Sequence, residues 1–219
     1  MADQRRLADV LGAAVGVPAA QTLAVATGMI GPRYPMERIE SALARLVADG
    51  LADTDEAFVA VAEALRTTDS RAKWATARAD LPASDGTIRT VTVSGVAKGV
   101  GMIHPRMATM LAYVLTDADV SPADLSRMLR PIVARTWDQL SVDGDTSTSD
   151  TVFLVASGAA GAARVSPSGA TWGPLSDAVE AVCGAGLDVV DGIDELVAKS
   201  LVTFDPTTAR YWLLEPIRQ

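Results

Sequence analysis

Three stretches in the first part of the chain carry apolar residues on one face of a 3.6-residue repeat. They predict amphipathic helices over residues 3–15, 37–50 and 54–66. Between the first two, the short apolar run TLAVATG at 22–28 ends in glycine and predicts a buried strand. The chain is therefore expected to begin with mostly helical structure.

The pattern changes to a two-residue period further along the chain. Val and Thr alternate in residues 87–99, which predicts a half-buried strand, and residues 110–118 and 150–160 are apolar enough for strands buried on both faces. Between these last two, residues 121–140 open with a Ser-Pro helix start and predict a helix that Pro131 should bend or interrupt. The order of these elements predicts an α/β fold with helices covering a sheet.

A change in composition suggests how the chain is divided. Residues 158–169 are small and polar, which is typical of a boundary. We predict a main domain over residues 1–160, a linker at 161–170, and a small segment of amphipathic helix and hairpin-like sequence over 171–219.

Composition and charge narrow the class of protein. Of the 219 residues, 49% are hydrophobic, so the chain can form a substantial core, and the net charge of −8 argues against a nucleic-acid surface. Cys183 is the only cysteine, which excludes an intrachain disulfide and a thiolate metal cluster. The sequence lacks both a signal-peptide pattern at its start and an apolar run of about 18 residues, the length of a membrane span. We therefore expect a cytoplasmic protein with no membrane contact.

Several generic motifs fail on inspection. Residues 95–101 lack the Gly-Lys-Ser/Thr ending of a phosphate loop, and residues 99–104 lack the third glycine of a dinucleotide fingerprint. Residues 143–154 begin like a calcium loop but have neither glycine at position six nor glutamate at position twelve. His104 is the only histidine and stands beside a proline, so it is interpreted as a structural loop residue rather than a catalytic base.

A threonine can act as a nucleophile without histidine if its own α-amine serves as the base. This requires cleavage of the peptide bond before it. Ala108–Thr109 suits such chemistry, because the pair follows a glycine-rich loop and opens the predicted strand at 110–118. Any strand can begin with threonine, however, so the pattern alone leaves a purely structural Thr109 open.

Four motifs, in the same order, resemble a known enzyme family. The stretch KGVGMIHPRMATML at 98–111 closely resembles the autoprocessing signature of the ornithine acetyltransferase (glutamate N-acetyltransferase) family. ATGMIG at 26–31, ALRTTDSRAK at 64–73 and VDGDTSTSDTVFLVASG at 142–158 resemble three further motifs of that family. The resemblance covers about residues 22–160 and implies the family's layered α/β sandwich, here incomplete.

The resemblance implies both a reaction and the residues that perform it. Thr109 would attack the Ala108–Thr109 bond, divide the chain, and then carry an acetyl group as an ester between N-acetylornithine and glutamate. The hydroxyl of Thr27 and the N–H of Gly28 would stabilise the oxyanion. Lys98 would bind the substrate carboxylate. No metal or cofactor is implied.

Other assignments leave an alternative beside the functional one. Thr67 falls at a substrate contact of the family but can also be a helix-capping residue, and Lys98 can also be a solvated surface lysine. The run from Asp143 to Asp150 is interpreted as a hydrogen-bonded loop that shapes the fold rather than a metal site.

The resemblance also has departures. Val100 and Arg106 stand where the family commonly has a small residue and asparagine, and the similarity stops after about residue 160. We therefore expect an oligomer of cleaved chains, or a partner that supplies the missing half, with apolar sheet surface left exposed. Residues 171–219 resemble a winged-helix segment of large bacterial ATP-binding transcriptional regulators. The alternative function is an inactive remnant that serves as a scaffold or regulatory interaction protein.

Overall fold

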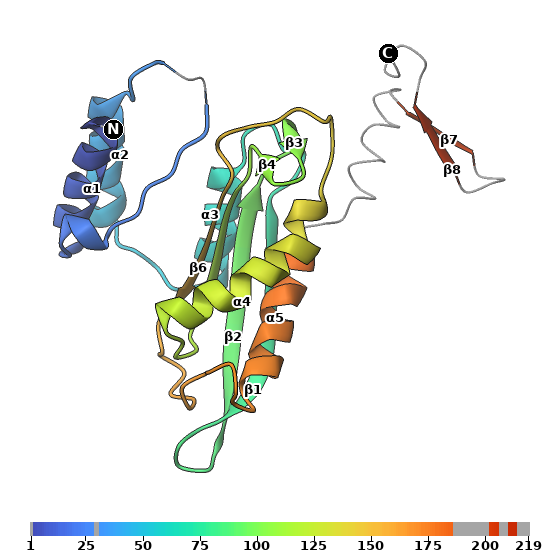
Figure 1. Ribbon diagram of the computed structural model, residues 1–219. Helices are drawn as coiled ribbons and strands as arrows, with labels where there is room; N and C mark the ends of the chain where they lie inside the picture. Colours follow the sequence, from blue (N-terminus) through green and yellow to red (C-terminus); the bar gives the residue numbers. More distant parts are fainter. Residues whose placement is uncertain (1, 29–30, 186–201, 206–209, 214–219) are drawn as a thin grey trace. The chain divides into compact units, whose positions relative to one another are not determined.

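The computed structural model describes residues 2–28, 31–185, 202–205 and 210–213 (Figure 1). The chain divides into two compact units, residues 1–64 and 65–219.

The first unit is helical. Helices α1 (Ala2–Val15) and α2 (Met36–Ala48) pack against each other, and α3 (Asp55–Leu65) follows at the end of the unit. The Thr54 hydroxyl accepts the backbone N–H of Ala57 at 3.2 Å, so Thr54 caps α3. All three predicted helices are confirmed.

The strand predicted at residues 22–28 is wrong. A short 3-10 turn, Ala19–Gln21, precedes this segment, and residues 22–28 themselves form no strand. Thr22 has extended backbone angles, but its side chain bonds to the carbonyl oxygens of Ala8 and Ala19 and the segment joins no ladder. A short apolar run is compatible with any extended segment, and only a pairing partner makes it a strand.

The second unit is built on a four-stranded sheet. Its strands are β1 (Lys73–Pro82), β2 (Ile88–Lys98), β5 (Leu111–Thr116) and β6 (Thr151–Ala156), in the spatial order β1-β2-β5-β6. The first two pairings are antiparallel, and β5 pairs with β6 in parallel through the crossover helix α4 (Pro122–Arg135). The α/β fold class is therefore confirmed, and β1 is an added strand that the pattern analysis missed.

One face of the sheet carries the core of this unit. Helices α4 and α5 (Trp172–Ala185) lie across it (Figure 1). A Cβ added to Gly95 in β2 would stand 2.6 Å from Cγ1 of Val182 in α5, so glycine allows the helix to approach the sheet closely. The opposite face is less covered, with Trp74, Leu115 and Val155 each 43–51% exposed. This agrees with the expected apolar exposure on the sheet. The prediction that the strands at 110–118 and 150–160 are buried on both faces is wrong, because helices cover only one face among the described residues.

Helix α4 continues through Pro131 rather than breaking there. Ser121 caps it by accepting the Asp124 N–H at 3.2 Å, and Pro122 occupies its first position. Pro131 is exposed, so water can hydrate the carbonyl whose hydrogen bond the proline removes. The predicted interruption is therefore wrong, whereas the alternative, a bend at Pro131, stays a prediction.

The segment after β6 remains attached to the same unit. Residues 161–170, expected as a linker, lead into α5, whose Leu175, Val179 and Cys183 are fully buried. Strands β7 (Val202–Asp205) and β8 (Arg210–Leu213) form an antiparallel hairpin. The rest of the winged-helix interpretation, over 186–201, 206–209 and 214–219, lies outside the described residues.

Among the described residues, each helix is too short or too polar to cross a bilayer.

Candidate active site

The predicted cleavage point lies in a strained hairpin between β2 and β5. The hairpin consists of β3 (Ile103–His104) and β4 (Met107–Ala108). Met102 and Arg106 have φ angles of 50° and 66°, which non-glycine residues rarely adopt. Such strain persists only where the surrounding structure imposes it, and it is common at functional sites.

Thr109 follows this hairpin directly and precedes β5, as the sequence predicts. Its backbone N–H donates to the carbonyl of Met102 at 2.8 Å. Its hydroxyl oxygen is buried and has no hydrogen-bond partner, and the preceding Ala108 is 5% exposed. A buried hydroxyl without a partner costs stability, so its presence calls for an explanation.

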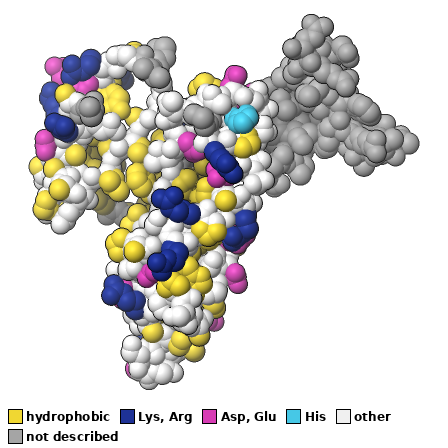
Figure 2. Space-filling view, viewed as in Figure 1, with side chains coloured by type: hydrophobic (Ala, Val, Ile, Leu, Met, Phe, Trp, Pro, Cys, Tyr) yellow, Lys and Arg dark blue, Asp and Glu magenta, His cyan; other side chains and the backbone are white. Residues whose placement is uncertain are grey.

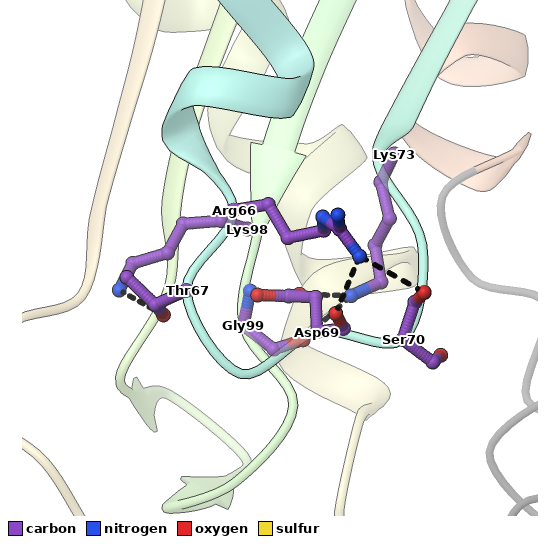
Figure 3. Close-up of polar contacts among 7 residues, drawn as sticks. All are labelled: Arg66, Thr67, Asp69, Ser70, Lys73, Lys98 and Gly99. Atoms are coloured by element: carbon purple, nitrogen blue, oxygen red, sulfur yellow. Dashed lines mark hydrogen bonds and ion pairs between the residues drawn. The ribbon is translucent and has the colours of Figure 1, made fainter.

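Lys98 and Thr67, predicted as substrate contacts, lie together. Lys98 ends β2 and is only 6% exposed, and its ammonium donates to the Thr67 hydroxyl at 3.4 Å (Figure 3). The alternative of a solvated Lys98 is therefore wrong. Thr67 lies beyond the end of α3 and contacts the lysine, and its substrate role stays a prediction.

A part-buried ion pair that no sequence pattern predicts lies beside these residues. Asp69, 5% exposed, pairs with Lys73, and the two side chains bind both backbone groups of Gly99 (Figure 3). The Gly99 N–H donates to Asp69 at 2.9 Å, and the Lys73 ammonium donates to the Gly99 carbonyl at 2.9 Å. We call this arrangement the Gly99 clamp. The only signal for it was the position of both side chains inside the motif at 64–73.

The pKa of Asp69 reflects this environment. Burial alone raises the pKa, but the hydrogen bonds from Lys73 and Gly99 outweigh burial, and the net shift is downward. Arg66 steadies the same turn by donating to the carbonyls of Asp69 and Ser70, at 3.3 and 3.1 Å (Figure 3).

Gly99 brings the two ends of the cleavage loop together. Its φ is +147°, and a Cβ added there would stand 3.0 Å from the carbonyl oxygen of Thr109. The Gly99 clamp therefore holds the backbone of Gly99, which lies against the backbone of Thr109, the predicted nucleophile. Lys98 directly precedes Gly99 in the chain and therefore lies next to this contact.

The acidic run after α4 binds the hairpin, as a hydrogen-bonded loop should. The carboxylate of Asp143 accepts the N–H groups of Met102 and Ile103 at 2.7 and 3.1 Å. Burial raises the pKa of Asp143, but these backbone donors outweigh it and lower the pKa overall. The interpretation of this run as a hydrogen-bonded loop is confirmed at Asp143.

Other predicted residues have separate outcomes. Thr27 and Gly28 lie in the first unit, and their oxyanion role stays a prediction. His104 is exposed, and its ring nitrogen Nδ1 lies 3.2 Å from the Pro105 carbonyl (Figure 2, cyan). This agrees with a structural loop residue and gives His104 no buried base position beside Thr109.

Comparison with known proteins adds independent information. The arginine biosynthesis bifunctional protein ArgJ of Symbiobacterium thermophilum is 40% identical over 186 residues, which are 83% of this chain and 43% of that protein. The mitochondrial proteins of the same name from Neosartorya fischeri and Aspergillus clavatus are 38% and 42% identical, over 84% and 68% of this chain and 38% and 32% of their own lengths. Because two of these names specify mitochondria, the cytoplasmic location stays a prediction.

The chain thus spans about a third to two fifths of these relatives, between 32% and 43%. The family model that matches is described as the ArgJ family and covers residues 1–188. This match includes α5, which the sequence analysis assigned to the separate tail segment. Matched over most of its length, and with the four motifs in order, the chain belongs to the ArgJ family, the family of ornithine acetyltransferases.

Proposed function

We propose that this chain takes part in acetyl transfer between N-acetylornithine and glutamate, after self-cleavage at Ala108–Thr109. The observation that carries the proposal is the buried, unpartnered Thr109 hydroxyl behind a strained hairpin. Family membership supports it, as do the relatives' names, which specify bifunctional proteins of arginine biosynthesis.

In the proposed self-cleavage, the Thr109 oxygen attacks the carbonyl carbon of Ala108. The C–N bond then breaks, and the hydroxyl proton passes to the departing Thr109 nitrogen, which leaves an ester between Ala108 and Thr109. Water hydrolyses this ester to give the Ala108 carboxylate, the Thr109 hydroxyl and a free Thr109 α-amine. That amine is the general base for the next reaction.

In the proposed transfer, Thr109 takes acetyl from N-acetylornithine and releases ornithine. The amine of glutamate then attacks the acetyl ester and restores the hydroxyl. Thr27 and Gly28 stabilise the oxyanion at each step. The Lys98 ammonium gives up its contact with the Thr67 hydroxyl and binds the substrate carboxylate instead.

Because the chain spans less than half of its relatives, the proposed pocket includes residues from elsewhere. An oligomer of cleaved chains or a partner chain supplies them in this proposal. The alternative is an inactive scaffold that keeps the fold without the chemistry, and the departures from the family motif at Val100 and Arg106 favour it.

Intact mass spectrometry of the purified chain tests the first step. We expect two fragments that meet at Ala108–Thr109, and an uncut Thr109→Ala variant. Incubation of the cut chain with N-acetylornithine should then give an acetylated Thr109 peptide. A wild-type chain that stays whole would contradict self-cleavage and favour the scaffold, whereas cleavage without acetylation would contradict only the transfer step.

A further inference from the structure

Asp143 lies in the loop that leads to β6, yet its carboxylate binds the hairpin that carries the predicted cleavage point. Its Oδ2 atom accepts the Met102 N–H at 2.7 Å, and its Oδ1 atom accepts the Ile103 N–H at 3.1 Å. The N–H of the neighbouring Val142 donates to the Ile103 carbonyl at 3.0 Å. Two consecutive residues of the loop therefore hold both backbone groups of Ile103.

The register of the hairpin explains why these backbone groups are available to the loop. Ile103 pairs with Ala108, and the Thr109 N–H donates to the Met102 carbonyl at 2.8 Å, which extends the ladder by one pair. In an antiparallel ladder, hydrogen-bonded pairs alternate with pairs whose backbone groups point away from the partner strand. Ile103 therefore directs its N–H outward, and the Met102 N–H is bound by Asp143.

One peptide group connects Asp143 to the predicted leaving nitrogen. The peptide between Met102 and Ile103 has its N–H bound by Asp143. Its carbonyl, that of Met102, accepts the Thr109 N–H. Successive hydrogen bonds polarise one another, so a carboxylate on the N–H side increases the partial negative charge of the carbonyl oxygen. The Met102 carbonyl is therefore a stronger acceptor for the nitrogen of the scissile bond.

The charge of the Thr109 nitrogen changes during the proposed self-cleavage. As the hydroxyl oxygen attacks Ala108, this nitrogen loses its amide conjugation and receives the hydroxyl proton, so it becomes more positive. An acceptor that already binds its N–H stabilises the transition state more than the resting amide. The same hydrogen bond restricts rotation of the scissile peptide, which favours an intramolecular attack.

Asp143 also restrains an unfavourable backbone conformation. Met102 has a φ of 50°, which methionine rarely adopts, and its side chain is 47% exposed, so close packing does not impose this conformation. The bond from the Met102 N–H to Asp143 is a direct restraint on the turn. The lowered pKa of Asp143 keeps its carboxylate charged at neutral pH, and a charged carboxylate accepts both N–H groups strongly.

Asp150 ends the same acidic run at the Thr109 end of the loop. It directly precedes β6, and the Thr151 N–H donates to the Met110 carbonyl at 2.9 Å, which places Asp150 beside the start of β5. Its Oδ1 atom is buried without a hydrogen-bond partner. Asp143 instead has both carboxylate oxygens bound to backbone N–H groups, so its position relative to the hairpin is well defined.

We propose that Asp143 is a positioning residue for self-cleavage, which holds the Met102 carbonyl against the Thr109 N–H and so fixes the leaving nitrogen and stabilises its growing positive charge. This inference rests on the proposed function and concerns its first step. Asp143 acts through the peptide between Met102 and Ile103 and takes no proton in the reaction.

The test follows cleavage of the full chain over time, by intact mass, in three variants. Asp143→Ala removes both acceptor oxygens and should slow cleavage by about tenfold, the lower end for loss of a hydrogen bond to a charged group, because Asp143 is exposed to water. Asp143→Asn keeps one acceptor oxygen without the charge and should be about threefold slower. The matched control, Asp145→Ala, removes an exposed carboxylate of the same loop and should leave the rate unchanged.

Hydroxylamine identifies the step that Asp143 supports. It attacks the ester between Ala108 and Thr109 and so accelerates the second step of cleavage, but it does not accelerate formation of the ester. The positioning role concerns ester formation, so Asp143→Ala should remain slow when hydroxylamine is added. A rate restored to that of the wild type would place the defect in ester hydrolysis and overturn the proposal.

Thermal unfolding of each uncut chain, in a Thr109→Ala background, separates positioning from general support of the fold. Because Asp143 is exposed, we expect Asp143→Ala and Asp143→Asn to melt close to the parent while their cleavage rates differ. If both variants slow cleavage equally and melt at a much lower temperature, Asp143 only supports the fold and the proposal is wrong.

The remaining outcomes are also decisive. A wild-type chain that stays whole overturns the proposed self-cleavage and this inference with it. A wild-type chain that is cut, together with Asp143→Ala cut at the same rate, overturns only the inference. If Asp143→Ala does not fold, Asp143→Asn carries the test. Slower cleavage in the folded Asn variant is expected, and the wild-type rate would contradict the positioning role.

Discussion

The Gly99 end and the Thr109 end of the cleavage loop lie against each other but hold their carboxylates in opposite ways. At the Gly99 end, Asp69 is paired with Lys73 and binds an amide, and its pKa is lowered. At the Thr109 end, Asp150 has no cationic partner among its described contacts, and burial raises its pKa. The first region favours the charged carboxylate, although Oδ2 of Asp69 is buried without a hydrogen-bond partner. The second keeps the unpartnered Thr109 hydroxyl and a carboxylate whose pKa is raised, and such costly groups are common at functional sites.

The largest effect should follow from removing Asp69. Asp69→Ala leaves the Lys73 ammonium without its carboxylate and frees the Gly99 amide, so the free energy of unfolding should fall by about 3 kcal/mol. Urea unfolding measures this. The control is Asp85→Ala, which removes an exposed partner of Arg89 and should cost less than about 1 kcal/mol. Equal losses in both variants would mean that the Gly99 clamp contributes no more to the free energy of unfolding than an exposed ion pair.

The same pair predicts a pH dependence. Because the pKa of Asp69 is lowered on folding, its contribution is present above the unfolded value of about 3.9 and is lost as the pH falls through the folded pKa. The stability difference between wild type and Asp69→Asn should therefore shrink in acid. Unfolding curves between about pH 7 and pH 3 measure it, and a difference that stays constant would contradict the lowered pKa.

A smaller loss is expected from Gly99→Ala. The added Cβ meets the Thr109 carbonyl at 3.0 Å and the backbone has a φ of +147°, so we expect a loss of about 1–3 kcal/mol. Gly86→Ala is the matched control, since Gly86 also has a positive φ of 80° but open space around it. Thermal unfolding of the two variants separates backbone strain from the contact with Thr109. If Gly86→Ala loses as much stability as Gly99→Ala, backbone strain alone explains both losses and the contact with the Thr109 carbonyl adds nothing.

At the other end, Thr109→Val should change stability in the opposite direction. Valine replaces the unpartnered hydroxyl with a methyl group of similar shape, so the uncut variant should be up to about 1 kcal/mol more stable than the uncut fraction of the wild type, which keeps the hydroxyl. Both should be measured as uncut chains by urea unfolding. A valine variant that is clearly less stable would show that the hydroxyl has a partner in solution.

The smallest effect should come from Asp150→Asn. Because the pKa of Asp150 is raised on folding, the wild type loses stability as the pH rises through that pKa, and the neutral asparagine does not. The variant should thus be slightly more stable at neutral pH, and the difference should close on acidification. Thermal unfolding in buffers of falling pH measures this, and a less stable variant at pH 7 would mean that the charged form is favoured.

Much of this contrast follows from patterns in the sequence, and part of it does not. Thr109 and Lys98 are both found in the motif at 98–111, and α4, β5 and β6 follow from their apolar periods. Strand β1 escaped because its covered face consists of the small residues Ala75, Ala77 and Ala79 and of one large residue, Leu81, at its end. Alanine gives a weak hydrophobic signal and is not typical of strands.

The supporting carboxylate of the Gly99 clamp is harder to predict for another reason. Asp69 is an ordinary acidic residue of a polar segment, and its role depends on an amide that is distant in sequence. Only the pairing of β1 with β2 brings these groups together. The strand predicted at 22–28 does not form, because its apolar pattern has no neighbouring strand with which to pair.

In the proposed self-cleavage, the parallel pairing of β5 with β6 gives maturation an order in time. The carboxylate that binds the amides of Met102 and Ile103, on the hairpin before the predicted nucleophile, is synthesised only after the whole α4 crossover. Parallel pairs need such a crossover and form late, since a long loop must close first. A nascent chain that has made Thr109 but not yet β6 would lack this support for cutting itself, and a cut would record that the second unit has folded.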